Sequence, residues 1–450
     1  MGDKNRQEHA RFDYENVAAL QQIIKKTGVK IPVNTSYERL RESVSIGSGK
    51  AANRLSVLPM EGCDAKADGS PSSLTVRRYK RFAQGGAGLI WVEATAVVPA
   101  GKANPRQLIL TKENLASFQS LAALIDQQAA VEPYKVLQLT HSGRYSRPVD
   151  KPAPQVAGRS QYLDKPGLQY DVLADEELDS LIPAYVKSAK LAQLAGFNAV
   201  DIKACHGYLI SELLGARYRE GRYGGSFENR TRFLLNIVDA VRQAVDIDIA
   251  VRLNAYDELP HPYGWGVRAE DCRQPDWNEM TSLLKLVEKK GVTLVNLTGG
   301  NPYYNPHVNR PYDSGPYKPP FHQLIHAEKL FKAAMHAKQA VPGLCVMATG
   351  FSWFRDLALP VAAGLIERNW CDLVGFGRQA FAYPDFAKAM LSGHFDKNKC
   401  CIACGKCSEI MRDGGCSGCV VFDREIYQPI YREGRAGKPP IASLEIKEHV

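Results

Sequence analysis

Short apolar runs rich in β-branched residues recur eight times between residues 55 and 378. Each run has the length of a strand buried on both faces of a parallel sheet. Most are separated by segments with helical apolar spacing, such as FLLNIVDAVRQAV (233–245). The eight runs are LSVLP (55–59), LIWVEA (89–94), KVLQLTH (135–141), AVDIKACHG (199–207), IAVRLNA (249–255), TLVNLTGG (293–300), CVMATG (345–350) and CDLVGFGR (371–378).

This alternation of strands and helices predicts a closed (β/α)8 TIM barrel rather than an open doubly wound sheet. The open sheet is disfavoured further because no Gly-x-Gly-x-x-Gly motif follows an early strand. The sequence also predicts where one helix begins, with Ser226 as the N-cap. Glu228 lies in the first turn, where the positive end of the helix dipole favours an acidic residue.

Three regions are expected from the pattern. Residues 51–392 should form the barrel, and residues 1–50 should form an N-terminal extension with one amphipathic helix in YENVAALQQIIKKTG (14–28). Residues 393–450 should form a cysteine-rich segment followed by a polar tail.

Polar and glycine residues stand at the ends of the apolar runs. Chemistry on barrels of this kind sits at the carboxyl ends of the strands, so these residues should converge on one mouth. Charged and amide groups in such buried places are costly unless they have a use. The residues are Glu61, Glu93, Gln138, His141, Lys203, His206, Arg252, Asn254, Thr298, Gly299, Gly350, Gly377 and Arg378.

The charge of the chain bears on which kind of ligand it binds. The 450 residues include 57 Lys+Arg and 48 Asp+Glu, a net charge of +9, with the basic residues scattered along the chain. This favours small anionic ligands over nucleic acid, which usually needs a concentrated basic stripe. The charged N-terminus does not resemble a signal peptide, and no apolar run approaches about 18 residues, so we expect a cytoplasmic protein without a membrane span.

The quoted motifs resemble one family in their order along the chain. HGYLISELLGARYREGRYGGSFENRTRFLLNIVDAVR (206–242) is similar to the central signature of the old yellow enzyme and 2,4-dienoyl-CoA reductase superfamily of FMN-dependent barrels. Supporting motifs are LPMEG (58–62), GGAGLIWVEAT (85–95), LQLTHSGR (137–144), VRLNAYD (251–257), ATG (348–350) and VGFGRQAFAYPDF (374–386). The resemblance covers about residues 50–420 and implies an FMN-dependent oxidoreductase.

The resemblance also implies where FMN binds. Its phosphate would meet backbone N–H groups around Gly350, Phe351, Gly377 and Arg378, with the Arg378 guanidinium adding charge-assisted hydrogen bonds. The ring would contact Pro59, Met60, Glu61, Ala94, Gln138 and Arg252. A member with covalently attached flavin would carry a cysteine near the first strand. Glu61 stands at the corresponding place and Cys63 lies two residues further on, so covalent attachment is not expected.

Six of the eleven cysteines lie within residues 400–419. In a reducing compartment, clustered thiols are more often metal ligands than disulfides. The segment is similar to the [4Fe–4S] segment of the dienoyl-CoA reductase and trimethylamine dehydrogenase branch, which implies Cys401, Cys404, Cys407 and Cys419 as ligands. The second gap is one residue shorter than usual, so Cys400 and Cys416 stay open as substitutes. A structural zinc, or a loop without metal, also stays open.

On the substrate side, Lys203, His206 and Tyr208 follow the fourth strand. The family places a histidine where Lys203 stands, followed three residues later by His or Asn, to hold the substrate's carbonyl oxygen. Here Lys203 and His206 would hold an activating carbonyl or carboxylate, and by the resemblance Tyr208 would donate a proton. Alternatively, Lys203 pairs with Glu61 or Glu93, and Tyr208 only packs on the flavin. The loop after the sixth strand should roof the pocket with Tyr303, Tyr304 or His307.

These features predict an ene-reductase in which reduced FMN delivers hydride to an activated C=C bond, with the cluster as an electron relay. Electrons would come from NADH or NADPH at the flavin, or from a redox partner protein through the cluster, because the chain stops before the FAD/NAD(P)H region usual in that branch. An amine dehydrogenase or N-demethylase, and a non-catalytic electron-transfer subunit, are the alternatives. The small-molecule substrate would be an enone, an enoate or an N-methylated amine, and a homo-oligomer stays open.

Overall fold

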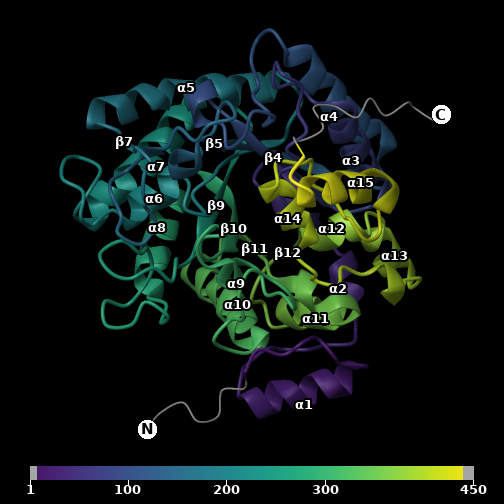
Figure 1. Cartoon of the computed structure of the whole chain (residues 1–450). Coiled ribbons are helices and arrows are strands. Elements are labelled where there is room, and N and C mark those ends of the chain that lie inside the picture. Colours follow the sequence, from purple (N-terminus) through teal and green to yellow (C-terminus); the bar gives the residue numbers. More distant parts are fainter. Residues whose placement is uncertain (1–7, 439–450) are drawn as a thin grey trace.

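The computed structural model describes residues 8–438, which contain a closed barrel of eight parallel strands (Figure 1). The last strand closes on the first through the pairing of Val374 with Leu55. Each apolar run identified in the sequence holds one strand, so the predicted (β/α)8 barrel is confirmed. In order around the barrel the strands are β3 (Leu55–Val57), β4 (Leu89–Ala96), β5 (Tyr134–Thr140), β8 (Ala199–Ile202), β9 (Asp248–Asn254), β10 (Val292–Thr298), β11 (Cys345–Ala348) and β12 (Leu373–Phe376).

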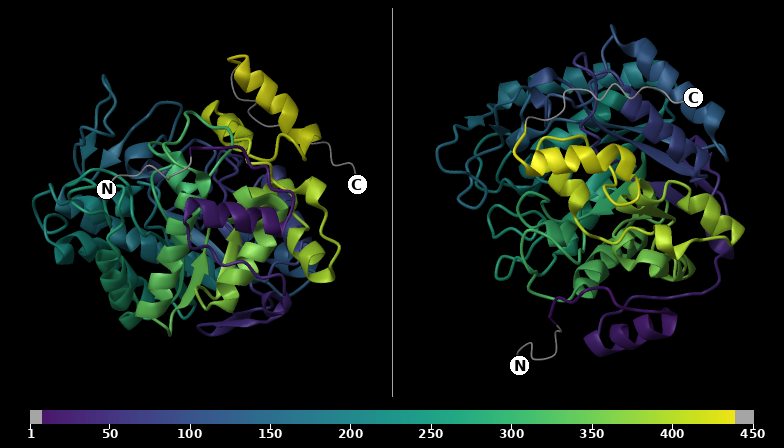
Figure 2. Two further views of the ribbon diagram at one scale, coloured as in Figure 1. Left: turned by 90° about the horizontal axis from the view of Figure 1, so that it is seen from below. Right: turned by 45° about the vertical axis from the view of Figure 1, so that its right-hand side comes forward.

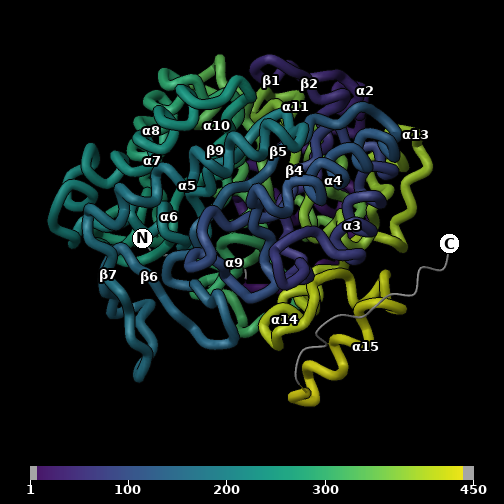
Figure 3. Tube along the Cα trace, turned by 90° about the horizontal axis from the view of Figure 1, so that it is seen from above, coloured from purple at the N-terminus to yellow at the C-terminus, as the bar shows by residue number. Residues whose placement is uncertain are grey.

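Helices connect the strands and surround them (Figure 3). They form because their apolar residues recur on one face, which packs against the barrel. Helix α7 begins as predicted, with the Ser226 hydroxyl accepting a hydrogen bond from the backbone N–H of Asn229 at 3.3 Å and Glu228 in the first turn. The connecting helices are α3 (Ser73–Gln84), α4 (Leu115–Gln128), α5 (Asp175–Leu194), α6 (Leu209–Gly215), α7 (Phe227–Arg242), α8 (Trp277–Lys289), α9 (Pro306–Asn309), α10 (Gln323–Ala340), η3 (Phe351–Leu357) and α11 (Ala358–Glu367).

A hairpin of β1 (Val44–Ile46) and β2 (Gly49–Ala51) closes the amino-terminal end of the barrel. Ile46 belongs to the same buried cluster as Trp91 and Tyr134 from the barrel strands. At Gly49 a Cβ would lie only 3.0 Å from the Tyr134 ring, so glycine allows this close approach. With this end filled, the opposite end is left for a site.

The remaining elements decorate the barrel. Helix α1 (Val17–Thr27) is capped by Asn16, falls within the predicted amphipathic stretch and packs near α10 at the edge of the molecule (Figure 1). No helix within residues 8–438 has the length and apolarity needed to cross a membrane. The short elements are α2 (Glu38–Arg41), η1 (Pro99–Gly101), η2 (Gly143–Tyr145) and the parallel pair β6 (Gln155–Val156) and β7 (Asp171–Val172).

The cysteine-rich segment lies against the barrel beside α3, where α14 and α15 pack together (Figures 1 and 2). Ion pairs and hydrogen bonds hold it there. Asp423, just before α15, pairs with Arg77 and Arg81 of α3, and the backbone N–H of Ser417 donates to the Gly62 carbonyl at 2.7 Å. The segment therefore reaches the loop that follows β3. Its helices, with those preceding it, are α12 (Arg378–Ala382), α13 (Phe386–Ser392), η4 (Lys397–Lys399), α14 (Lys406–Arg412) and α15 (Arg424–Arg435).

Candidate active site at the barrel mouth

A buried carboxylate organises the inner wall of the mouth. Asp201, in β8, accepts hydrogen bonds from the Gln138 amide at 2.6 Å, the Trp91 indole at 3.0 Å and the backbone N–H of Arg252 at 2.6 Å. Burial raises the pKa of the Asp201 carboxyl to about 6, and the hydrogen bonds work in the opposite direction. Asp201 thus fixes the Gln138 amide. The sequence analysis missed it, although an aspartate inside the apolar strand AVDI was a signal.

Residues expected around the flavin come together from separate strands. Arg252 reaches across the mouth, and its guanidinium donates to the Pro59 carbonyl at 3.3 Å. Gly377 faces Met60, because a Cβ there would lie 2.9 Å from the methionine sulfur. Ala94 lies in an irregularity of the β4–β5 pairing, and such bulges often re-aim the chain beside functional sites.

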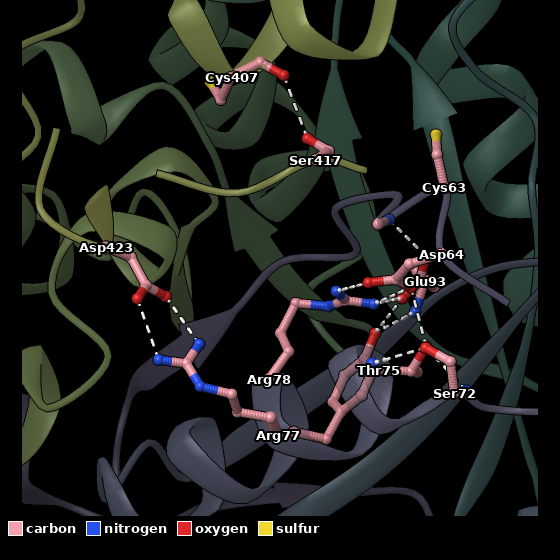
Figure 4. A network of polar contacts seen from close by, with 12 residues as sticks. Cys63, Asp64, Ser72, Thr75, Arg77, Arg78, Glu93, Cys407, Ser417 and Asp423 are labelled. Carbon is pink, nitrogen blue, oxygen red and sulfur yellow. Dashed lines mark hydrogen bonds and ion pairs between the residues drawn. The ribbon is translucent and has the colours of Figure 1, made fainter. Parts of the chain in front are cut away.

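A buried ion network fixes the loop after β3 (Figure 4). Arg78 of α3 pairs with Asp64 at 2.6 Å and with Glu93 of β4 at 2.5 Å, and its side chain is only 4% exposed. Glu93 in turn accepts a hydrogen bond from the backbone N–H of Gly62 at 2.5 Å. Burial raises the pKa of the Glu93 carboxyl. The network ties α3, β4 and the Pro59–Gly62 loop together, and the sequence analysis did not find it.

Lys203, Tyr208 and Glu61 meet at the barrel mouth. Glu61 accepts a hydrogen bond from the Tyr208 hydroxyl at 2.9 Å and forms an ion pair with the Lys203 ammonium at 3.2 Å. The ammonium lies 3.6 Å from the centre of the Tyr208 ring. Burial and the Glu61 charge hold the pKa of Tyr208 well above its usual value, so the phenol keeps its proton. The pairing of Lys203 with Glu61, left open by the sequence, is present, whereas Glu93 is engaged by Arg78.

His206 lies behind this trio in a left-handed backbone conformation, with φ 67°. Its Nε2 is 2.9 Å from the Asn309 side-chain nitrogen. The Asn309 oxygen faces Arg310, which can only donate, so the Asn309 nitrogen must face His206 and Nε2 accepts. Burial, Arg252 and Lys203 hold the pKa of His206 well below its usual value, which makes it a neutral imidazole that donates only from Nδ1.

Of the three residues expected to roof the pocket, Tyr303 contacts the site. Its hydroxyl is 3.1 Å from that of Tyr208, its ring stacks on Tyr145 with centres 3.8 Å apart, and it is 44% exposed. Tyr304 is exposed, and His307 is buried with its Nδ1 2.5 Å from the Tyr317 hydroxyl. The loop therefore connects the buried Tyr208 hydroxyl to the surface through Tyr303.

The corner between β11 and β12 holds an unsatisfied buried donor. Arg378 is 6% exposed; one of its terminal nitrogens donates to the Pro311 carbonyl at 2.7 Å, and the other finds no partner within residues 8–438. Gly350 has φ 107°, a conformation that L side chains rarely adopt, directly before Phe351. A buried N–H without a partner is costly unless a ligand accepts from it. The donor set fits an anionic phosphate.

Four cysteines line one hollow in the C-terminal segment, namely Cys401, Cys404, Cys407 and Cys419, together with Arg378. Cys400 and Cys416 do not line it, since the Cys400 sulfur faces the Asp396 carbonyl and Cys416 packs in an apolar cluster. In the part of the chain that is described, no three His, Cys, Asp or Glu side chains converge closely enough to hold one metal ion. Several thiolates in one hollow are the kind of ligand set that soft metal ions and iron–sulfur clusters take.

One family model and several known proteins match the chain. The sequence model of the NADH:flavin oxidoreductase / NADH oxidase family matches residues 40–263. An NADPH dehydrogenase of Geobacillus sp. (strain WCH70) is 34% identical over 256 residues, which are 55% of this chain and 69% of that protein.

Solved structures share the fold. A 2-naphthoyl-CoA reductase in complex with 2-naphthoyl-CoA matches 89% of this chain with a TM-score of 0.72 and 21% identity. Histamine dehydrogenase from Rhizobium sp. 4-9 matches 86% with a TM-score of 0.67 and 21% identity. The chain spans only 58% and 53% of these two solved chains.

Proposed function

The chain belongs to the NADH:flavin oxidoreductase / NADH oxidase family of FMN-dependent oxidoreductases, and from this premise we propose that it is an ene-reductase acting on activated C=C bonds. The observation that carries the proposal is the contact of Tyr208 and Lys203 with Glu61 at the barrel mouth. The phenol and the ammonium lie side by side, so they would serve one substrate position as proton donor and cation, which is what reduction of an enone or enoate requires.

FMN would be held by residues from six strands and their loops. Arg378 and the backbone around Gly350, Phe351 and Gly377 would bind the phosphate, and the unsatisfied Arg378 nitrogen supports this assignment. The ring would lie against Pro59, Met60, Glu61 and Ala94, with Gln138 and Arg252 at its polar edge. When bound, FMN supplies hydride transfer at its ring.

The protein side chains would then bind the substrate and move one proton. Lys203 and the Nδ1–H of His206 would hold the activating carbonyl or carboxylate, so that Lys203 exchanges its Glu61 partner for substrate oxygen. Tyr208 would donate its proton to the α-carbon. The high pKa of Tyr208 supports this order, because the phenol releases its proton only to a strong base such as a carbanion.

Cys401, Cys404, Cys407 and Cys419 would hold a [4Fe–4S] cluster that passes single electrons. Their shared hollow includes Arg378, the residue assigned to the flavin phosphate, which supports a cluster site adjacent to the flavin site. NADH or NADPH at the flavin, or a redox partner protein at the cluster, would supply the electrons.

Loss of the Tyr208 hydroxyl should slow reoxidation of the flavin by substrate without slowing its reduction. In Tyr208→Phe, we expect flavin reduction by NADPH to stay unchanged and reoxidation by an enone to slow by about 10²–10⁴-fold, because general acid catalysis contributes about this much. Stopped-flow absorbance of the flavin under anaerobic conditions measures both steps. Tyr304→Phe, which removes a hydroxyl from an exposed neighbour in the roof loop, should leave both rates unchanged. Equal reoxidation in Tyr208→Phe and wild type would exclude this proton donor.

The flavin assignment has its own test. Purified protein should carry FMN, and Arg378→Gln should weaken FMN binding by about 10- to 100-fold through loss of a charge-assisted hydrogen bond. Arg368→Gln, an exposed arginine after α11, is the control. Bleaching by NADPH and recovery with an enone or enoate supports the proposal. Bleaching by an N-methylated amine indicates an amine dehydrogenase or N-demethylase instead, and bound flavin without turnover indicates a non-catalytic subunit.

A further inference from the structure

The Tyr208 hydroxyl is shielded from bulk water at the barrel mouth. Tyr208 is only 2% exposed, and within residues 8–438 its hydroxyl has two hydrogen-bonding partners. Glu61 accepts from it at 2.9 Å, and the Tyr303 hydroxyl lies 3.1 Å away. A proton that returns to this hydroxyl therefore comes through a neighbouring side chain.

The hydrogen bonds at this hydroxyl run in one direction. Glu61 is a carboxylate paired with the Lys203 ammonium at 3.2 Å, and it can only accept, so the Tyr208 hydrogen points to Glu61. A phenol carries a single hydrogen, and the Tyr303 hydroxyl must therefore donate in the 3.1 Å contact with Tyr208. The three groups form a chain from Tyr303 through Tyr208 to Glu61.

Tyr303 is held in place although part of it meets solvent. Its ring stacks on Tyr145, with centres 3.8 Å apart and 20° between the planes. Its backbone N–H donates to the Asn301 side-chain oxygen at 3.0 Å, and the nitrogen of the same amide donates to the Tyr145 hydroxyl at 2.6 Å. Tyr303 is 44% exposed. It thus presents a fixed hydroxyl between the buried Tyr208 and the surface.

The proposed reaction leaves Tyr208 without its proton after each turnover. As a C–H bond forms at the substrate α-carbon, the O–H bond of Tyr208 breaks and a buried phenolate remains. Glu61, as a carboxylate, has no proton to give. The Lys203 ammonium lies over the Tyr208 ring and pairs with Glu61. Among the described residues, this leaves Tyr303 as the neighbour whose O–H faces the phenolate.

We propose that Tyr303 returns the proton to Tyr208 after each turnover. The Tyr303 hydroxyl gives its hydrogen to the Tyr208 phenolate, and water or a buffer acid at the surface then gives a proton to Tyr303. Each cycle moves one proton from solvent to the substrate α-carbon, while the hydride carries the electron pair to the β-carbon. Tyr303 is a positioning residue, because it acts through Tyr208. This inference rests on the proposed ene-reductase function and adds a proton relay to it.

A single turnover and repeated turnovers should respond differently to Tyr303→Phe, which keeps the stacked ring. Dithionite-reduced, FMN-loaded protein mixed with equimolar cyclohexenone should reoxidise near the wild-type rate, because Tyr208 still carries its own proton. The steady-state kcat with NADPH and excess enone should fall by about 100-fold, the low end of what a positioned proton donor contributes. Tyrosinate absorbance should persist after the first turnover. Tyr304→Phe, which removes an exposed hydroxyl from the same loop, should match the wild type throughout.

Chemical rescue gives a second readout. Tyr303→Ala opens space beside Tyr208, so its kcat should rise with the concentration of imidazole buffer, whereas the wild type and Tyr304→Phe should not respond. A wild-type kcat in Tyr303→Phe, with or without a raised KM, overturns the relay, and so does a Tyr303→Ala variant that imidazole does not rescue. Equal slowing of the first and later turnovers in Tyr303→Phe also overturns it. Wild-type flavin that an enone does not reoxidise overturns the proposed function, and the relay with it.

Discussion

Arg78→Met is expected to lower the free energy of unfolding by about 3–5 kcal/mol, because it leaves two buried carboxylates without their cation. Arg78 is the one guanidinium that contacts both Asp64 and Glu93 in the described part of the chain (Figure 4). Gly62 also packs on it, since a Cβ there would lie 2.2 Å from the Arg78 nitrogen. Urea unfolding followed by circular dichroism measures the change.

The neighbouring arginine provides the matched control. Arg77 pairs with Asp423 at 2.8 Å, but its side chain is 34% exposed, so Arg77→Met should cost about 1 kcal/mol or less. Arg78→Lys keeps the positive charge but loses the planar guanidinium, which can donate to two carboxylates at once. Its free energy of unfolding should therefore lie between those of Arg77→Met and Arg78→Met. Equal urea midpoints for Arg77→Met and Arg78→Met would contradict the account. Because Arg78 holds the Pro59–Gly62 loop, Arg78→Met should also retain less flavin than Arg77→Met.

The barrel was predictable because its strands are almost entirely buried on both faces and read as short, mainly apolar runs. The β1–β2 hairpin was not, since its strands are three residues long and Ser45 and Lys50 are exposed. Its apolar residues become informative only once the barrel end that they fill is known. The hairpin crosses the boundary expected near residue 50, so the N-terminal extension and the barrel share one buried cluster.

Rim residues such as Lys203 and Arg252 were predictable from chain position, because parallel strands end at the same edge of a barrel. The residues that these rim side chains contact were harder to predict from the sequence. The Arg78 network joins a helix, a loop and a strand. Such pairings depend on the docking of separate elements, which apolar periodicity does not encode. The Glu61–Lys203 pair was anticipated as an alternative because both residues end barrel strands.

Replacing Cys407 by serine should abolish the proposed iron–sulfur cluster. Wild-type protein reconstituted anaerobically should contain about four irons per chain and a broad visible absorption band. In Cys407→Ser both should fall to a small fraction, because an alcohol is a poor ligand where a soft thiolate is needed. Iron analysis and absorption spectroscopy of the same samples provide the measurement. Bound zinc at one ion per chain, without a visible band, would instead support the zinc alternative.

Cys400 and Cys416 give the matched controls for ligand choice. The Cys400 sulfur is 3.9 Å from the Asp396 carbonyl, and Cys416 packs against apolar residues of α14 and α15, so serine at either position should leave the iron content unchanged. The shortened gap between Cys404 and Cys407 is accommodated by Gly405, whose φ of 77° turns the chain directly before α14. If Cys400→Ser or Cys416→Ser lost the iron while Cys407→Ser kept it, the short gap would have displaced a ligand, and the hollow beside Arg378 would not be the cluster site.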